Sequence, residues 1–404
     1  MKETKEVRIT HKTKELILDH YHCTLFLPLT GLEKTDFIPS IKRQYYCHDS
    51  TLEKGEAAGF YYFSPTVRDI LYDCPKKPRT LTPIKEWRLP TEKLEKWELH
   101  LGQEKYICEY AQYQKSKVTS VRLLQYFNGL YLLAIRLEPL ALYQLKKQEE
   151  TATLYDAKEN NISYFINKDK KNTTLYQQLI MEDWMHFSRL VRLIYPSFEQ
   201  QTVEDKIAPI HLIKDGTKIS AYDYQKTIPE TKIKIPKSAG ENFSPVILEF
   251  IKAFAKRPEN VEKQVKQSVD FYDDRMFISV AYGIAGPALP AHSLEGINTL
   301  VSHIDRQEAD GWDKLEGGYA YTPQVIREKT KKQAYSLWEG LGVYYTFTDF
   351  SNTYLSTGGE FRSYIAPDHI PHIYDRMLIQ ALFYQASLRH YDNEICTVTE
   401  GFVK

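Results

Sequence analysis

The chain has 404 residues, enough for one large domain or two ordinary ones, because single hydrophobic cores stop growing at roughly 250–300 residues. Its residues are 42% hydrophobic and 26% charged, a globular balance that argues against a disordered chain. Lys+Arg and Asp+Glu are equal at 53 each, so no net charge draws the whole protein to nucleic acid or to an anionic membrane.

The cysteines are scattered, and they include no C-x-x-C pair: Cys23, Cys47, Cys74, Cys108 and Cys396. An odd, dispersed set argues against a disulfide framework or a zinc site and favours a reducing compartment. The N-terminus lacks the apolar run of a signal peptide, and no apolar stretch approaches the ~20 residues that a membrane helix needs. We therefore expect that the chain as given does not span a bilayer.

The first third of the chain is predicted to be rich in strands. Leu16 to Leu29 mixes β-forming residues and ends at a Pro/Gly turn. From Val121 to Leu137, two largely apolar runs flank Asn128-Gly129, which predicts a hairpin with a type I′ turn. Because both runs are nearly all apolar, we expect strands that are buried on two faces.

Helix signals are spread along the chain. Ser64 and Pro65 open a short predicted helix, and Ser244 with Pro245 opens another that extends to Phe254. A longer helix is expected at about 175–194. The interval 145–174 is polar and aperiodic, and it is interpreted as a surface insertion or a mobile loop.

The last third is predicted to return to strands before a final helix. Met276 to Ile284 is a predicted strand, followed by a loop rich in Gly and Pro, and further short strands are expected at 343–350 and 353–355. A long helix is predicted from about Pro371. Its apolar stripe at helical spacing comprises Ile373, Met377, Leu378, Ala381, Leu382, Leu388, Tyr391 and Ile395.

These elements predict an α+β fold with a mixed β-sheet flanked by helices and a long C-terminal helix. We expect residues 1–366 to form one α/β domain that carries the polar insertion at 145–174. Residues 367–404 are then expected to begin a long, stalk-like helix.

The acidic pair Asp273-Asp274 is a candidate Mg²⁺ site, because Mg²⁺ prefers oxygen ligands and keeps much of its hydration shell. On a strand, however, adjacent side chains face opposite ways, so only one of the two could enter a given site. The alternative is that one of them pairs with Arg275 or caps a turn.

A small anionic or nucleotide ligand is predicted near Arg275 and the loop from Tyr282 to His292. Loops held by a rigid scaffold commonly carry binding residues. The planar fork of Arg275 suits phosphate, and Tyr282 is expected to stack on a base.

Three groups of residues are candidate metal ligands, and one of them is the loose group of His292, His303 and Asp305. His20 and His22 are two apart on a predicted strand, and His369 and His372 are three apart at the start of the last helix. His303 and Asp305 fall in a helical pattern, where they would not share a face. Neither H-E-x-x-H nor a third-ligand motif accompanies them, so no stoichiometric zinc is expected. The chain also has no G-x-S-x-G, Walker A or G-x-G-x-x-G motif, and we expect no enzyme.

The last helix, HIPHIYDRMLIQALFYQASLRHYDNEI, resembles the start of the long stalk helix of divergent CorA-like divalent-cation transporters. The segments DDRMFISVAYG, LWEGLGVYYTFTDFSNTYL and FYYFSPTVRDILY are similar to the cytoplasmic part of the same proteins. The Gly-Met-Asn pore signature of that family is absent here, and so are both membrane helices.

The resemblance implies a ligand-sensing regulatory domain on the cytoplasmic face of the bacterial inner membrane, joined to the membrane only through a segment absent from this chain. It implies a homo-oligomer, a pentamer in classical relatives, with Mg²⁺ bound between cytoplasmic domains. One branch accompanies type III CRISPR loci in antiviral defence, and this branch implies gating by a SAM–AMP conjugate with no direct nucleic-acid contact. The alternative is a soluble nucleotide-binding defence protein or an enzyme with an unrecognised site.

Overall fold

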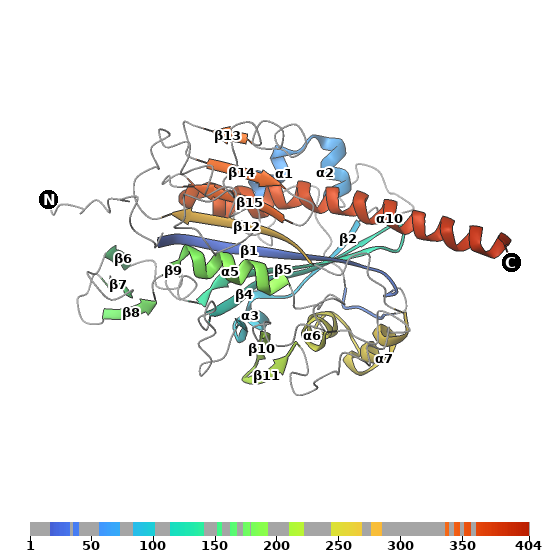
Figure 1. The fold of residues 1–404 in the computed structure, drawn as a ribbon, viewed down its shortest axis with the longest axis horizontal. Helices are drawn as coiled ribbons and strands as arrows, with labels where there is room; N and C mark the ends of the chain where they lie inside the picture. The colour runs from blue at the N-terminus through green and yellow to red at the C-terminus, as the bar shows by residue number, and fades with distance from the viewer. Residues whose placement is uncertain are drawn as a thin grey trace, which may run out of the picture.

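The fold of the 404-residue chain was obtained as a computed structural model. It describes residues 17–32, 35–39, 56–72, 84–101, 114–140, 152–155, 162–167, 173–177, 179–192, 210–221, 244–268, 276–284, 336–338, 343–347, 351–356 and 361–403. The predicted α+β class is confirmed, with a mixed sheet, flanking helices and a long C-terminal helix (Figure 1).

The described strands form a large twelve-stranded sheet. Its central path runs β11 (Thr217–Ser220), β10 (Ile210–Lys214), β3 (Trp97–Leu101), β4 (Gln114–Tyr126), β5 (Tyr131–Pro139), β1 (Ile17–Leu29), β12 (Phe277–Ile284), β15 (Ser351–Ser356), β14 (Val343–Phe347) and β13 (Ser336–Trp338). Off this path, β2 (Ile84–Arg88) pairs with the second half of β4, and β9 (Leu179–Ile180) pairs with β1.

The sheet is mostly antiparallel, and β12 runs parallel to β15. The strand predictions at 16–29, 276–284, 343–350 and 353–355 are therefore confirmed as β1, β12, β14 and β15. For the interval 145–174, the loop interpretation is corrected, because the interval contains strands of a second sheet formed by β6 (Ala152–Tyr155), β7 (Ile162–Asn167) and β8 (Thr173–Gln177). The interpretation as a surface insertion stays a prediction.

Helices cover both faces of the large sheet, which gives three layers (Figure 1). One face packs against α3 (Thr91–Leu94), α5 (Met181–Val191), α6 (Pro245–Lys252) and α7 (Pro258–Ser268). The other packs against α1 (Glu56–Tyr62), α2 (Pro65–Leu71), the π-helical segment η6 (Phe361–Tyr374) and α10 (Asp375–Val403). The helices expected after Ser64 and Ser244 are confirmed as α2 and α6, whereas the helix expected at 175–194 is shorter.

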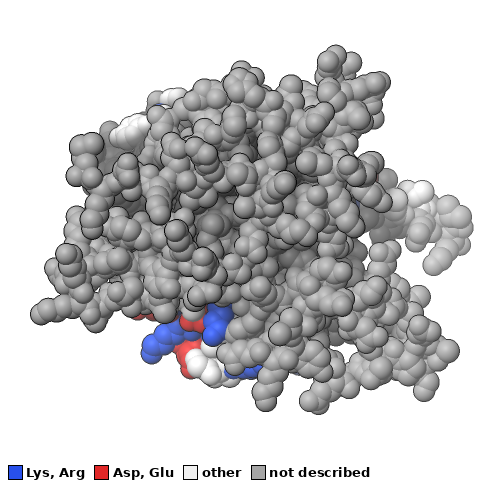
Figure 2. Space-filling model, turned by 60° about the vertical axis from the view of Figure 1, so that its left-hand side comes forward, with Lys and Arg blue, Asp and Glu red and all other residues white. Residues whose placement is uncertain are grey.

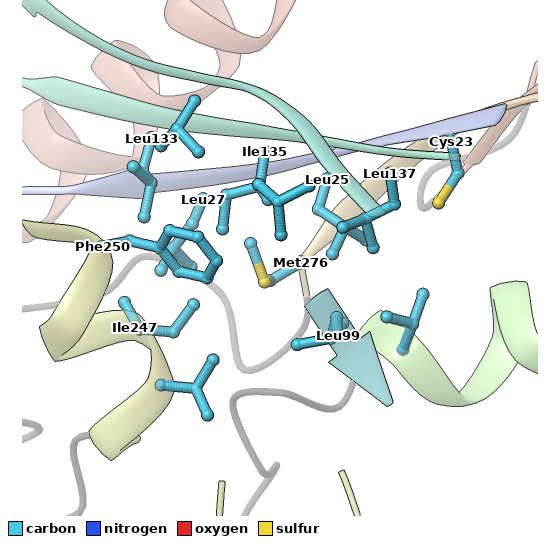
Figure 3. Packing of buried hydrophobic residues seen from close by; sticks show 14 of the residues in the cluster. Cys23, Leu25, Leu27, Leu99, Leu133, Ile135, Leu137, Ile247, Phe250 and Met276 are labelled. Carbon is cyan, nitrogen blue, oxygen red and sulfur yellow. The ribbon is translucent and has the colours of Figure 1, made fainter. Parts of the chain in front are cut away.

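The main core lies between the sheet and α5, α6 and α7. Alternate residues of β1, including Leu25 and Leu27, point into it together with Leu133 and Ile135 of β5 (Figure 3). Phe250 of α6 meets them from the helical layer. Because residues of opposite parity on the same strands face α10, β1 and β5 are buried on both sides, as their apolar sequences predict.

The hairpin between β4 and β5 is confirmed, but its turn differs from the predicted type. Gly129 has φ 82°, and its amide donates to the carbonyl of Tyr126 at 3.1 Å. Among the described residues, Asp215 is the non-glycine position with positive φ, so Asn128 does not adopt the left-handed conformation that a type I′ turn requires. The loop is a type I turn closed by a left-handed glycine, and the Asn128 side chain bonds instead to Ser387 of α10 at 3.0 Å.

The backbones of α1 and η6 lie in close contact. A Cβ atom added to Gly59 would collide with the carbonyl oxygen of His372, and the Tyr72 hydroxyl donates to the same carbonyl at 3.4 Å. The start of the C-terminal helical unit is therefore held by α1 and α2 on one side and by the sheet on the other.

We expect Gly129→Val to lower the free energy of unfolding by about 1–2 kcal/mol, because a β-branched residue resists the left-handed conformation. Gly129→Asn is the matched control, since asparagine tolerates that conformation and should cost less. Urea denaturation of both variants measures the difference. Equal losses for Val and Asn would show that backbone conformation does not set the cost.

Candidate functional site

Of the residues predicted to bind a ligand or a metal ion, Asp273, Asp274, Arg275 and His292 lie outside the described residues. Tyr282 is described, and it is fully buried on the α5 side of β12. Its hydroxyl bonds to Ser188 Oγ at 2.9 Å, and burial raises its pKa well above the usual range. This placement corrects the expectation of a stacking platform, since the Tyr282 ring is part of the core.

The described histidines among the candidate metal ligands contact other side chains of the fold. His20 and His22 point to the same side of β1, as predicted, and hydrogen-bond to each other between Nε2 and Nδ1 at 2.8 Å. His372 is buried in η6, and the ring of His369 lies edge-on to that of Tyr374. Within the described ranges no three His, Cys, Asp or Glu residues gather to hold a metal ion. His303 and Asp305 fall outside these ranges.

A different group of residues stands out on the sheet face beneath η6 and α10. Toward Phe26 and Leu132 this face is apolar, but along the same strands it becomes polar and charged while remaining buried. We call its charged part the root cluster, because it surrounds the first residues of α10. It comprises Glu86, Arg88, Arg122, Arg136, Glu138, Asp375 and Arg376.

Arg376 is the centre of this cluster. It is 2% exposed, and both terminal nitrogens of its guanidinium donate to the two carboxylate oxygens of Glu86, at 2.9 and 3.2 Å. Its guanidinium carbon also lies 5.2 Å from the centroid of the Tyr72 ring. This bidentate geometry is the strongest form of Arg–carboxylate pairing, and it joins α10 to β2, while the ring contact joins α10 to the residue that follows α2.

Asp375 fixes the same helix to three other strands. Its two carboxylate oxygens accept from Thr24 of β1 at 3.1 Å and from Ser279 of β12 at 3.0 Å. Asn352 of β15 donates in turn to Ser279 at 3.3 Å. Burial raises the pKa of Asp375, while Arg122 and Arg136 act against that rise by favouring the ionised form.

Among the described residues, the root cluster contains four arginines and three carboxylates. Arg136 pairs with Glu138 at 3.5 Å, and Arg88 with Glu86 at 3.4 Å. Burial lowers the pKa of Arg122 to about 10, and the neighbouring Arg376 adds to this effect. An excess of guanidinium groups among the described residues favours the approach of an anion, because guanidinium pairs well with carboxylate and phosphate.

A second polar row crosses the edge strands of the same sheet. His211 of β10 lies opposite His100 of β3, and His100 lies opposite Lys115 of β4. His100 Nε2 is 2.8 Å from a carboxylate oxygen of Glu98. Burial lowers the pKa of His211 to about 4, with smaller contributions from Lys218 and His100, so His211 is neutral at physiological pH. Figure 2 shows one face of the molecule, on which the coloured Lys and Arg side chains lie next to Asp and Glu side chains.

Sequence reasoning missed the root cluster. The available signal was a charge inside an otherwise apolar strand, as at Arg122 in VRLLQYF and at Glu86 in IKEWR. Charged residues are seldom buried unless they are paired, so these positions required partners. The partner Arg376 is 290 residues away from Glu86, and no local pattern connects the two.

Comparison with known proteins does not extend this description: the chain matches no protein-family model, no curated protein and no solved structure. Among the described helices, none combines the length and apolarity needed to cross a membrane.

We expect Arg376→Met to lower the free energy of unfolding by about 3–5 kcal/mol, because it leaves the buried Glu86 carboxylate without its main partner. The double variant Glu86→Leu/Arg376→Met should recover part of this loss, since both charges are then removed. Urea denaturation of the two single variants and the double variant completes the cycle. Strictly additive losses would argue against a coupled pair.

We expect the folded protein to lose stability in acid because of His211. Its pKa is depressed in the folded chain, so its contribution is complete above the unfolded value of about 6.5 and is lost as the pH falls toward 4. The variant His211→Gln cannot be protonated and should show a shallower fall in stability over this window. Urea midpoints at pH 7.0 and 4.5 test this, and parallel falls for both proteins would refute it.

Proposed function

We propose that this chain is the regulatory, ligand-sensing domain of a CorA-like cation channel, and that α10 transmits the ligand state of the sheet to the rest of the assembly. The proposal places the chain at the cytoplasmic face of the bacterial inner membrane. The observation that carries it is the root cluster, where Asp375 and Arg376 tie the first turn of a long helix to β1, β2, β12 and the residue that follows α2.

A sensor needs a connection that is rigid in each state and sensitive to charge. The bidentate pair between Arg376 and Glu86 meets the first requirement, because its geometry fixes the helix in position and rotation. The excess of arginines over carboxylates among the described residues of the root cluster supports the second requirement. An anion near Arg122 would compete for the same guanidinium groups that hold Glu86 and Asp375.

The ligand in this proposal is a phosphate-bearing adenine nucleotide, with SAM–AMP conjugates as the leading class. Planar guanidinium groups suit bidentate recognition of phosphate. Mg²⁺ is the alternative ligand, and an acidic site would serve it better than the arginine-rich root cluster. A regulatory domain of this kind binds its ligand without converting it.

The test combines binding with the response of the helix. Calorimetry with ATP, SAM, a SAM–AMP conjugate and MgCl₂ identifies the ligand, and hydrogen exchange follows the amides of residues 375–387 with and without it. We expect a nucleotide to bind and to change exchange in that segment. Arg122→Gln should weaken binding at least tenfold, because it removes one charge-assisted contact.

Arg389→Gln is the control for this experiment, since Arg389 lies on α10 beyond the root cluster and should leave affinity unchanged. Binding without any change in residues 375–387 would refute transmission through α10. Turnover of the nucleotide would establish an enzyme instead, and the absence of binding by all four compounds would remove the sensor proposal.

A further inference from the structure

The carboxylate of Asp375 is surrounded by groups that also suit a phosphate. It is fully buried, and the hydroxyl groups of Thr24 and Ser279 donate to its two oxygens at 3.1 and 3.0 Å. The positive charges of Arg122 and Arg136 favour its ionised form. Two hydroxyl donors and two guanidinium groups around one oxyanion can serve a phosphate group as well as a carboxylate.

Asp375 is held less firmly than Glu86 of the same cluster. Glu86 accepts two hydrogen bonds from the guanidinium of Arg376, at 2.9 and 3.2 Å. The hydrogen bonds described for Asp375 come from neutral hydroxyl groups instead. Because a bidentate ion pair is stronger than hydrogen bonds from hydroxyl groups, an incoming anion would displace Asp375 more easily than Glu86.

Thr24 and Ser279 belong to a row of residues that crosses the sheet beneath the start of α10. The row runs from Arg136 of β5 through Thr24 of β1 and Ser279 of β12 to Asn352 of β15, and each residue lies opposite the next. Since neighbouring strands are about 4.8 Å apart, the row is roughly 14 Å long. An extended nucleoside monophosphate has a similar length.

Each end of this row has a buried polar atom without a hydrogen-bond partner among the described residues. These atoms are Nε of Arg136 and Oδ1 of Asn352. Ser279 donates its hydrogen to Asp375 and therefore accepts from Nδ2 of Asn352 at 3.3 Å, which fixes the orientation of the amide. Because buried polar atoms are nearly always paired in folded proteins, the two ends suit a ligand with an anionic group and a hydrogen-bond donor.

We propose that Asp375 occupies the phosphate subsite of the ligand site and competes with the ligand for it. The phosphate of the ligand takes over the hydroxyl donors of Thr24 and Ser279, and a hydroxyl or amino group of the same ligand donates to Oδ1 of Asn352. The displaced carboxylate leaves the sheet together with the first turn of α10. This inference rests on the proposed sensing function and adds how binding releases the helix.

The first experiment measures affinity by calorimetry with ATP and with a SAM–AMP conjugate. Asp375→Asn keeps the size of the side chain but removes its charge, so it should bind the nucleotide at least about tenfold more tightly than the wild type. Asp392→Asn is the matched control, because it removes the same charge from an exposed position of the same helix and should leave affinity unchanged. Asn352→Leu should weaken binding about tenfold, since the ligand loses an acceptor.

The second experiment uses inorganic phosphate and does not depend on a nucleotide. Urea denaturation of the wild type, Asp375→Asn and Asp375→Ala is measured in sodium phosphate and in sodium chloride at equal ionic strength. Phosphate strengthens apolar burial in any protein, so the wild type supplies the baseline. We expect both variants to gain more stability from phosphate than the wild type does, because the anion replaces the missing carboxylate. If Asp375→Ala does not fold, Asp375→Asn decides the result.

The outcomes separate this inference from the sensor proposal. Equal affinity of Asp375→Asn and the wild type for a nucleotide that binds both would overturn the competition and leave the sensor proposal intact. A response of the Asp375 variants to phosphate no larger than that of the wild type would overturn the phosphate subsite. A larger response without nucleotide binding by any variant would support the subsite for phosphate and remove the nucleotide sensor.

Discussion

The buried pair between Arg376 and Glu86 constrains much of this structure. Taking two charges out of water costs several kcal/mol for each ion, and good geometry is required to offset it. Here a fully enclosed guanidinium meets both oxygens of one carboxylate, with Tyr72 against its face. A shift of α10 by even a fraction of a turn would separate these groups. The pair therefore specifies where the helix sits, while apolar packing supplies most of the stability.

One face of the sheet contributes mainly to stability, and the other fixes the position of α10. The face toward α5 and α6 is a continuous apolar core, with Leu25, Leu133 and Phe250 at its centre (Figure 3). The face toward α10 is apolar near Phe26 but charged around Arg122. Hydrophobic contacts are non-directional and tolerate small displacements, whereas hydrogen-bonded charges do not. The directional interactions that fix the position of α10 therefore lie on the face of the sheet that packs against this helix.

Local patterns predicted the elements that depend on local chemistry. Pro65, Pro245 and the apolar run after Met276 each marked an element that the structure contains. The turn at Asn128-Gly129 was assigned the wrong type, because the hairpin register and the bond from Asn128 to Ser387 decided its conformation. The left-handed pair expected there occurs at Asp215-Gly216, where a two-residue loop joins β10 and β11. The root cluster was not predictable, since its partners come from distant strands and no single-sequence signal pairs them.

The apolar stripe of the last helix illustrates a further limit and leads to a mechanical consequence. Periodicity identifies apolar residues but does not show which neighbour covers them, so Leu382 and Leu388 looked alike although one faces the sheet and the other faces outward. Both faces belong to one rigid rod, in which successive residues are 100° apart around the axis. A rotation that loosens Asp375 from Thr24 and Ser279 would turn the exposed apolar side chains of α10, such as Leu388, through the same angle.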